Sequence, residues 1–452
     1  MRFSLIVLLV IIFMIPAQAQ DSVQSKLSFR EAIKFGLENN LNLNQQENLL
    51  ISARVDKTAG LLSIGPRIAI NGNAGRNDGN SFIQQEGAVV NGVTDFVSAS
   101  VDASMPLFQG FSTINTYRQS SSLLESQLHL VKRTNQDVIR EVSRLYLLCL
   151  LDQQLVVINT QNLEAQLKQY EQIQAHVEAG SRAEVDLNNQ EYQVKNAELL
   201  VVRAKNTLRN DKALLARTIQ LDPAISFDLV EPSLSIIDYQ NIALDDLYKT
   251  AYDHRSDLQV AKSNEEATRY GMKAARGTYF PSISLFASYG SAYNYIYRNE
   301  VLTDVENRSF AQQFRTDNKQ FTYGVSFSIP IFGGFQTRST VVRNRISYEN
   351  SKLEAENAEL LVKSEVLLAY QNLKDAQIAF QAADAQLNAA KTSNNLEKER
   401  YALGISDIVA LTQSVQAYTR AQADYESARY TLMFQNVLIN HATGTLKIED
   451  IE

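Results

Sequence analysis

Two stretches of this chain, residues 111–179 and 335–403, contain neither glycine nor proline. These residue types are the strongest local breakers of helices, so each stretch can run as one uninterrupted helix. At 1.5 Å per residue, a helix of about 65 residues would extend about 100 Å. Globular helices seldom reach this length, which favours a coiled coil or a barrel of helices over a compact core.

The breakers that bound these stretches occur twice along the chain, at nearly constant spacing. The pairs are Pro66 with Pro281, Pro106 with Pro330, and Gly180 with Gly404. Shared breakers indicate shared architecture, so the chain is predicted to be an internal twofold repeat. Each half is predicted to contain a helix, a strand, a loop, a strand, a very long helix, a tight turn and a returning helix.

Apolar residues in the second stretch follow a heptad pattern. They are spaced alternately four and three residues apart, and alanine alternates with a larger residue, as in the seam of a coiled coil. The seam consists of Val362, Val366, Ala369, Leu373, Ala376, Phe380, Ala383, Leu387 and Ala390. The returning helix carries two apolar stripes, namely Ile408, Leu411, Val415, Tyr418 and Tyr425, and then Ala417, Ala421, Ala428 and Leu438. A helix held from two sides is typical of a closed ring of helices.

Four runs alternate between apolar and polar side chains, as strands do. They begin near residues 68, 97, 283 and 321, and each is about 10 residues long, the length of a tilted membrane-spanning strand. The polar segments 76–95 and 290–320 are predicted to be external loops. Four strands cannot close a barrel, so we predict that the chain oligomerises to cover its strand edges; three copies would supply 12 strands. The alternative interpretation is two soluble hairpins, each with one buried face.

The first 19 residues are predicted to be a signal peptide. Arg2 supplies a positive charge, residues 5–15 are apolar, and Ala17-Gln18-Ala19 is a small-residue site for cleavage after Ala19. No later stretch approaches the 18 consecutive apolar residues of a membrane-spanning helix. Any membrane crossing is therefore predicted to use strands.

The composition argues against several classes of function. A formal net charge of −7 disfavours a nucleic-acid binder.

Cys149, the single cysteine, follows Leu145 at helical spacing and is predicted to be a packed thiol rather than a reactive one. The histidines lack a metal-ligand spacing, and motifs for a nucleophile or a phosphate-binding loop are missing, so we predict no enzyme, no metal and no cofactor. The histidines are His129, His176, His254 and His441.

The two glycine-containing turns have the features of sharp helix reversals. Gly180 and Gly404 are each predicted to adopt the left-handed conformation just beyond a helix. Ser181-Arg182-Ala183-Glu184 is predicted to form a capping box for the next helix. Ser406 is predicted to be the corresponding N-cap in the second half.

These signals divide the chain into successive segments. They are a signal peptide (1–19), an N-terminal helix of repeat 1 (20–65), strand pair 1 with its loop (66–106), helical hairpin 1 (107–221), an equatorial segment (222–243), a helix of repeat 2 (244–280), strand pair 2 with its loop (281–330), helical hairpin 2 (331–446) and a tail (447–452). The equatorial segment and the tail are predicted to lie together as a belt.

At this point the chain resembles the TolC-type outer-membrane efflux proteins, over about residues 27–446. The resemblance rests on the twofold repeat, the glycine turns and two strand-to-helix junctions of the pattern Pro-x-Phe-x-Gly-Phe, which contain Pro106, Gly110, Pro330, Gly333 and Gly334. It implies a mainly helical homotrimer in which a 12-stranded outer-membrane β-barrel continues as a 12-helix barrel through the periplasm. It also implies a periplasmic adaptor and an inner-membrane transporter as partners, outer-membrane lipid around the strands, and no cofactor or catalytic step.

The family pattern further implies a gate at the helical tips. It places an acidic residue at Asp186 and a tyrosine at Tyr401, which would form a hydroxyl–carboxylate hydrogen bond. The family's arginine after the second glycine is replaced here by Ser406, and its acidic residues are replaced by Ala410 and Gln413. The replacement ion pairs would come from Arg182, Glu184, Arg400 and Asp407.

The function most consistent with these features is the outer-membrane exit duct of a tripartite efflux or type I secretion system. The alternative is a soluble periplasmic coiled-coil adaptor or structural protein, which would not need strand pairs of membrane length. The sequence does not identify the exported substrate.

Overall fold

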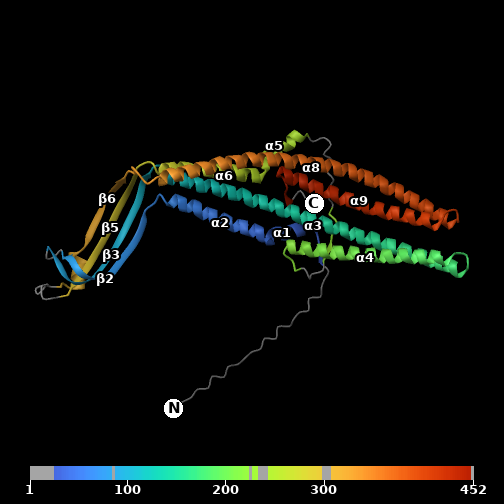
Figure 1. Cartoon of the computed structure of the whole chain (residues 1–452), viewed down its shortest axis with the longest axis horizontal. Helices are drawn as coiled ribbons and strands as arrows, with labels where there is room; N and C mark the ends of the chain where they lie inside the picture. Colours follow the sequence, from blue (N-terminus) through green and yellow to red (C-terminus); the bar gives the residue numbers. More distant parts are fainter. Residues whose placement is uncertain (1–24, 84–86, 223–226, 233–242, 298–306, 449–452) are drawn as a thin grey trace, which may run out of the picture.

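The computed structural model describes residues 25–83, 87–222, 227–232, 243–297 and 307–448. The molecule is elongated, with a β-sheet at one end and the tips of two helical hairpins at the other (Figure 1). The predicted signal peptide, the greater part of the predicted equatorial segment and the last residues of the tail lie outside the described residues.

The elements follow the order predicted for two repeats. The helical elements are α1 (Phe29–Asn39), α2 (Leu41–Leu62), α3 (Ser112–Glu178), α4 (Glu184–Thr218), α5 (Leu244–His254), α6 (Ser256–Gly277), α7 (Phe310–Gln312), the π-helical turn η1 (Gln313–Asp317), α8 (Gln336–Ala402) and α9 (Ile408–Thr443). The strands are β1 (Ser25–Leu27), β2 (Arg67–Ile83), β3 (Ala88–Gln109), β4 (Phe227–Leu229), β5 (Ser282–Ile296) and β6 (Gln320–Ser328).

Strands β2, β3, β5 and β6 form one antiparallel sheet in that order. The two predicted hairpins are therefore joined, because β3 of the first repeat pairs with β5 of the second. The predicted strand length of about 10 residues is wrong for β2, β3 and β5, which have 17, 22 and 15 residues. The β2–β3 ladder continues through most of segment 76–95, and β5 continues into segment 290–320, although both segments were predicted to be loops. The alternation of apolar and polar side chains ends before the backbone hydrogen bonding does. Only the alternation is visible in the sequence, so the strands were predicted to be too short.

The register gathers the apolar residues of all four strands on one face of the sheet. Ile70, Val101, Tyr289 and Phe321 form one row across it. Serines and other small residues dominate the opposite face, which also carries Phe96 over Gly75 and Phe286 over Gly324. Ile70 is 81% exposed and Tyr323 is 75% exposed. The long helices begin beyond the end of this sheet and extend away from it (Figure 1), so they leave its apolar face uncovered.

Helices α3 and α8, of 67 residues each, form the long axis of the molecule. The predicted seam of α8 is confirmed over its central part, where it packs against α5, α6 and α9. Its buried members are Val362, Val366, Ala369, Leu373, Ala376 and Ala383. Leu360, Leu361 and Leu368 lie outside the seam and remain more than half exposed. Helix α9 packs against both α8 and α3, as its two apolar stripes predicted.

Two helices predicted to be continuous are each interrupted once. The first breaks at Asn40 between α1 and α2, and the second breaks at Arg255 between α5 and α6. Both residues have extended backbone conformations. Asn40 also caps α2, since its side-chain oxygen accepts a hydrogen bond from the Leu43 N–H at 3.0 Å. Neither break contains glycine or proline, so no breaker signalled them in the sequence.

A hydrophobic core lies midway along the molecule, where the short strands β1 and β4 pair in parallel. The Tyr146 hydroxyl of α3 lies 2.8 Å from the Leu27 carbonyl oxygen and 2.6 Å from that of Val230, which ties both strands to the long helix. Leu446 and Ile448 pack in the same cluster as Phe227 and Leu229. The described parts of the equatorial segment and the C-terminal tail thus meet at one level.

Cys149 lies in this core and is fully buried. Burial raises the pKa of its thiol to about 12. A thiol that stays protonated at neutral pH is a poor nucleophile, which confirms the prediction of a packed cysteine.

Candidate functional site

The two hairpin tips reverse through the glycines that the sequence singled out. Gly180 has φ of +72° and Gly404 has φ of +71°, so both occupy the left-handed region. The Gly180 N–H donates to the Val177 carbonyl, and the Ser181 N–H donates to the His176 carbonyl. Gly404 and Ile405 make the equivalent bonds at the second tip. This pattern is the Schellman motif, and it confirms the predicted helix ends.

The predicted caps of the returning helices are wrong at both tips. Ala183, not Ser181, is the N-cap of α4, and it has no side-chain bond. The Ser181 hydroxyl instead donates to the His176 carbonyl at 2.9 Å. At the second tip, Asp407 caps α9 by accepting from the Ala410 N–H at 2.8 Å, while Ser406 hydrogen-bonds to Glu397. At the first tip the Schellman turn engages Ser181, and the cap falls two residues later. At the second tip the Ser406 hydroxyl is engaged by Glu397, and the cap falls one residue later.

Arg182 connects the two tips. Its guanidinium lies 4.9 Å from the centre of the Tyr401 ring on α8 and 3.9 Å from the Asp186 carboxylate on α4. Burial raises the pKa of the Tyr401 hydroxyl above its ordinary value. Within the described chain, Asp186 and Tyr401 are not directly hydrogen-bonded; Arg182 is the residue that contacts both. All three residues were predicted to lie at the tips, but the predicted direct bond between Asp186 and Tyr401 is replaced by separate contacts of each with Arg182.

The other predicted tip charges make local contacts. Arg400 pairs with Glu397 of its own helix at 3.1 Å. Glu184 and Asp186 lie in the first turn of α4, where negative charge favours the positive end of the helix dipole. Ala410 and Gln413 lie on the first turns of α9. Of the predicted replacement charges, Arg182 is the one that joins the two hairpins.

The strand-to-helix junctions explain the spacing of their shared motif. In each, two consecutive residues are left-handed: Gly110 with Phe111, and Gly334 with Phe335. This double turn brings the second phenylalanine back onto the first, with ring centres 5.2 Å apart for Phe108 and Phe111. Phe332 and Phe335 make the equivalent contact at 6.3 Å. The pattern Phe-x-Gly-Phe is therefore a closed aromatic turn that directs a strand into a helix.

The prolines of the two junctions differ in position. Pro106 lies within β3 at a shift in the pairing register between Pro106 and Phe108, where a missing N–H is tolerated. Pro330 lies two residues beyond Ser328, the last residue of β6, and Gly333 precedes the left-handed pair.

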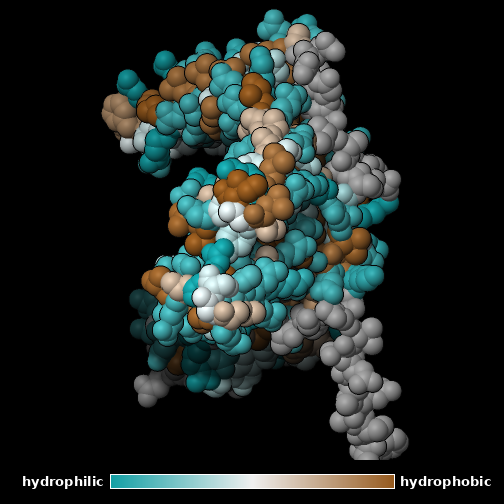
Figure 2. All heavy atoms as spheres, turned by 90° about the vertical axis from the view of Figure 1, so that its right-hand side faces the viewer, coloured by the Kyte–Doolittle hydropathy of each residue, from teal (hydrophilic) through white to brown (hydrophobic). Residues whose placement is uncertain are grey.

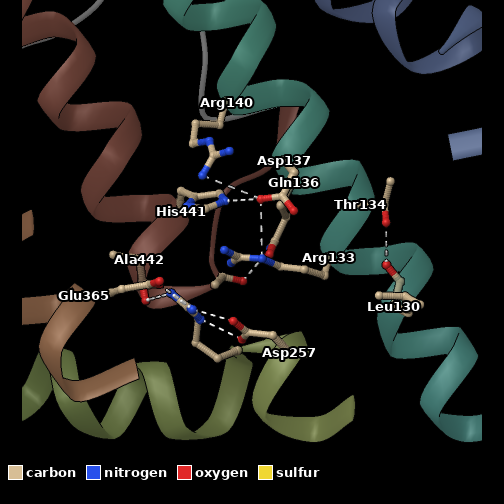
Figure 3. A network of polar contacts seen from close by, with 12 residues as sticks. Leu130, Arg133, Thr134, Gln136, Asp137, Arg140, Asp257, Glu365, His441 and Ala442 are labelled. Atoms are coloured by element: carbon tan, nitrogen blue, oxygen red, sulfur yellow. Dashed lines mark hydrogen bonds and ion pairs between the residues drawn. The ribbon is translucent and has the colours of Figure 1, made fainter. Parts of the chain in front are cut away.

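A polar network at mid-height joins four helices and was not found by sequence reasoning (Figure 3). Arg255, at the break between α5 and α6, has no exposed surface. Its guanidinium donates to Asp257 at 2.5 and 2.8 Å, to Glu365 of α8 at 2.6 Å and to the Ala442 carbonyl of α9 at 3.2 Å. The backbone break at Arg255 is thus held by a buried side chain that pairs with residues distant in sequence. Because these partners are far apart along the chain, no local sequence pattern reveals the break.

The same network contains a buried histidine. The His441 Nε2 atom of α9 lies 2.7 Å from the Asp137 carboxylate of α3. Burial lowers the pKa of His441 despite this carboxylate. Burial alone would raise the pKa of Asp137, but the bond to His441 and the charge of Arg133 outweigh it and lower that pKa. Asp137 therefore remains ionised at neutral pH and links α3 to α9.

In the described ranges, no helix is sufficiently long and apolar to cross a membrane. Nor do these ranges bring three or more histidine, cysteine, aspartate or glutamate side chains together in a group that could hold a metal ion.

Comparison with known families identifies the chain. A family model described as outer membrane efflux protein matches residues 33–219 and 247–445, which are the two repeats. The chain therefore belongs to the outer membrane efflux protein family. The resemblance inferred from the repeat, the junctions and the glycine turns is confirmed.

Individual relatives agree with this assignment. The outer membrane protein TolC of Vibrio cholerae is 22% identical over 368 residues, which cover 79% of each chain. The probable efflux pump outer membrane protein TtgC of Pseudomonas putida is 20% identical over 446 residues, covering 95% of this chain and 87% of the relative. These relatives are described as outer-membrane proteins rather than as enzymes.

Solved structures share the fold. The outer membrane protein VceC of Vibrio cholerae matches with a TM-score of 0.80 at 12% identity, covering 92% of this chain and 96% of VceC. The CmeC outer membrane channel of Campylobacter jejuni matches with a TM-score of 0.77 at 16% identity, covering 92% and 85%.

Proposed function

We propose that this chain is one subunit of a trimeric outer-membrane efflux channel, a passive exit duct that extends into the periplasm. The observation that carries the proposal is the exposed apolar face of the β2-β3-β5-β6 sheet, which the chain's own long helices leave uncovered. In water such a face would be costly, whereas lipid would accept it. A soluble adaptor would not need an exposed apolar face on its sheet.

The open edges of the chain support the proposed trimer. Strands β2 and β6 are the two edges of the sheet, and edge strands expose unpaired backbone groups. Apolar residues are also exposed on α2, next to β2, and on α8, next to β6. They include Leu49, Ile51 and Val55 on α2 and Leu360, Leu361 and Leu368 on α8.

The internal repeat suggests how these edges would meet. Within the chain, β3 of the first repeat pairs with β5 of the second. The second strand of one repeat thus pairs with the first strand of the following repeat. The same pairing between copies would join β6 of one copy to β2 of the next. Three copies joined in this way would supply 12 strands and close the sheet, because a closed barrel leaves no edge.

The hairpin tips are the proposed docking site for a periplasmic adaptor and an inner-membrane transporter. They lie at the end of the molecule farthest from the sheet (Figure 1). Val185, Leu403, Ile405 and Val409 are more than half exposed there. Viewed from this end, apolar groups interrupt a largely polar surface (Figure 2). Surface patches of this kind are typical of sites that bind other proteins.

Extraction and conductance test the proposal. The protein should leave the outer membrane only with detergent, run as a heat-sensitive trimer, and form conducting pores in planar bilayers. A freely soluble monomer that forms no pores would instead support the adaptor alternative.

A further inference from the structure

The segment between β5 and β6 is anchored along the edge of β5. Strand β6 pairs with β5 only as far as Gly290, yet β5 continues to Ile296. Beyond that point side chains replace the missing strand. The Gln313 amide bonds both the N–H and the carbonyl of Asn294, at 3.1 and 3.0 Å. The Asn307 amide does the same for Ile296, at 2.9 and 2.7 Å.

The anchored segment lies against the apolar face of the sheet. Phe310 packs on Tyr293 with ring centres 5.1 Å apart, and Phe314 stacks on Phe310 at 5.0 Å. Tyr293 is opposite Val97 in the register and so belongs to the apolar face. The π-helical turn η1 therefore stands above the sheet on the face that we propose contacts lipid.

A cavity of about 350 Å³ lies between η1 and the sheet. Its lining includes Ile70, Val101 and Tyr289 from three neighbouring strands, and Phe314 from η1. A cavity of this size lined by aliphatic and aromatic side chains suits a hydrocarbon chain rather than a polar solute.

Two cations stand at the rim of this cavity. Arg315 and Lys319 both line it, and both side chains are exposed. The nearby carboxylate of Asp317 pairs with Arg308 at 3.0 Å. Within the described chain, neither Arg315 nor Lys319 has a carboxylate within ion-pair distance. The rim is therefore positively charged while the interior is apolar.

The height of the cavity fits the external half of a membrane. Ala99 and Val101 line it, five to seven residues beyond Pro106 at the helical end of β3. At about 3.3 Å per residue this is about 16–23 Å along the strand, which corresponds to a height of about 12–19 Å at the strand tilt of about 35–45° in membrane barrels. The apolar band of such a barrel is about 25 Å tall, so the cavity lies from about the middle of the band into its external half.

We propose that this cavity binds an anionic lipid of the external leaflet. One acyl chain occupies the apolar interior, and the lipid phosphate lies between Arg315 and Lys319. The proposal rests on the membrane placement of the sheet given above. It assigns a role to a segment that the sequence analysis described only as a polar external loop.

Lipid retention by the purified trimer tests this assignment. Native mass spectrometry would count the lipids bound after titration with phosphatidylglycerol or with phosphatidylcholine of the same acyl chains. The wild type should prefer phosphatidylglycerol by at least about tenfold. Phosphatidylglycerol carries a net negative charge, and each of the two cations, Arg315 and Lys319, should add several-fold to its affinity. The double variant Arg315→Gln with Lys319→Gln should lose this preference. The matched variant Lys391→Gln with Lys398→Gln removes the same charge from α8, far from the sheet, and should keep it.

A second variant tests the acyl chain. Ala99→Phe should fill the cavity and reduce retention of both lipids while leaving Arg315 and Lys319 in place. Equal binding of both lipids by the wild type, or displacement of the lipid by inorganic phosphate alone, would overturn the proposal. Trimers that conduct normally but show no lipid preference would contradict this inference alone, whereas failure to insert would contradict the proposed function.

Discussion

Single residues decide how the two hairpins are held together at their tips. Arg182 contacts the Tyr401 ring and the Asp186 carboxylate, and so connects α8 to α4. A cation over an aromatic ring contributes about 0.5–1 kcal/mol. A partly exposed ion pair contributes about 0–1 kcal/mol. Their sum is small enough for partner proteins to overcome, as the gate implied by the family resemblance would require.

The first prediction concerns this arginine. Arg182→Ala should raise the open probability of single channels in planar bilayers by a few-fold and up to about tenfold, since about 1.4 kcal/mol corresponds to tenfold. Arg400→Ala is the matched control, because Arg400 pairs only with Glu397 of its own helix among the described contacts. If both variants gated like the wild type, Arg182 would have no part in closing the tips.

Local sequence signals located the tip residues but not their bonds. The glycines were predictable, because few other residues adopt a left-handed conformation at a helix end. The caps were not, since Ser181 and Ser406 had alternative partners in His176 and Glu397. Arg255 gave no signal at all, because Glu365 and Ala442, to which it bonds, are distant in sequence.

At the scale of elements, the junctions set the direction in which each long helix leaves the sheet. Gly110 meets the end of α6 so closely that a Cβ atom on it would lie 2.1 Å from the Gly277 carbonyl oxygen. At the tip, a Cβ atom on Gly404 would meet nothing within 4 Å. Both glycines have left-handed backbone conformations, so the two positions differ mainly in the space available for a Cβ atom.

This difference gives the second prediction. Gly404→Ala should cost only the backbone strain of about 1–2 kcal/mol and leave most of the trimer intact. Gly110→Ala adds a clash with backbone and should strongly reduce the amount of heat-sensitive trimer in the outer membrane and lower its thermal midpoint. Gel analysis of unheated membranes would measure both. Equal losses in the two variants would contradict the packing of α3 against α6.

Element types were largely predictable, whereas element lengths were not. The long helices α3 and α8 followed from the absence of glycine and proline. The strands β2 and β3 extend beyond their apolar alternation, because backbone hydrogen bonding does not require apolar side chains. The breaks at Asn40 and Arg255 depend on capping and on buried ion pairs, which residue patterns do not reveal.

For the whole molecule, a single copy leaves strand edges and apolar surface uncovered. Its sheet has two open edges, β2 and β6, and an uncovered apolar face. Helices α2 and α8, which follow the same two sides of the molecule, also expose apolar residues. The repeat provides the pairing that would join these sides between copies. The proposed duct therefore requires three copies that together close one continuous wall.

A density map of the detergent-solubilised particle would show whether three copies close the wall. We expect three copies in a ring, with β6 of each hydrogen-bonded to β2 of the next and with the row from Ile70 to Phe321 facing the detergent. A single copy whose own helices fold over the apolar face of its sheet would contradict this expectation.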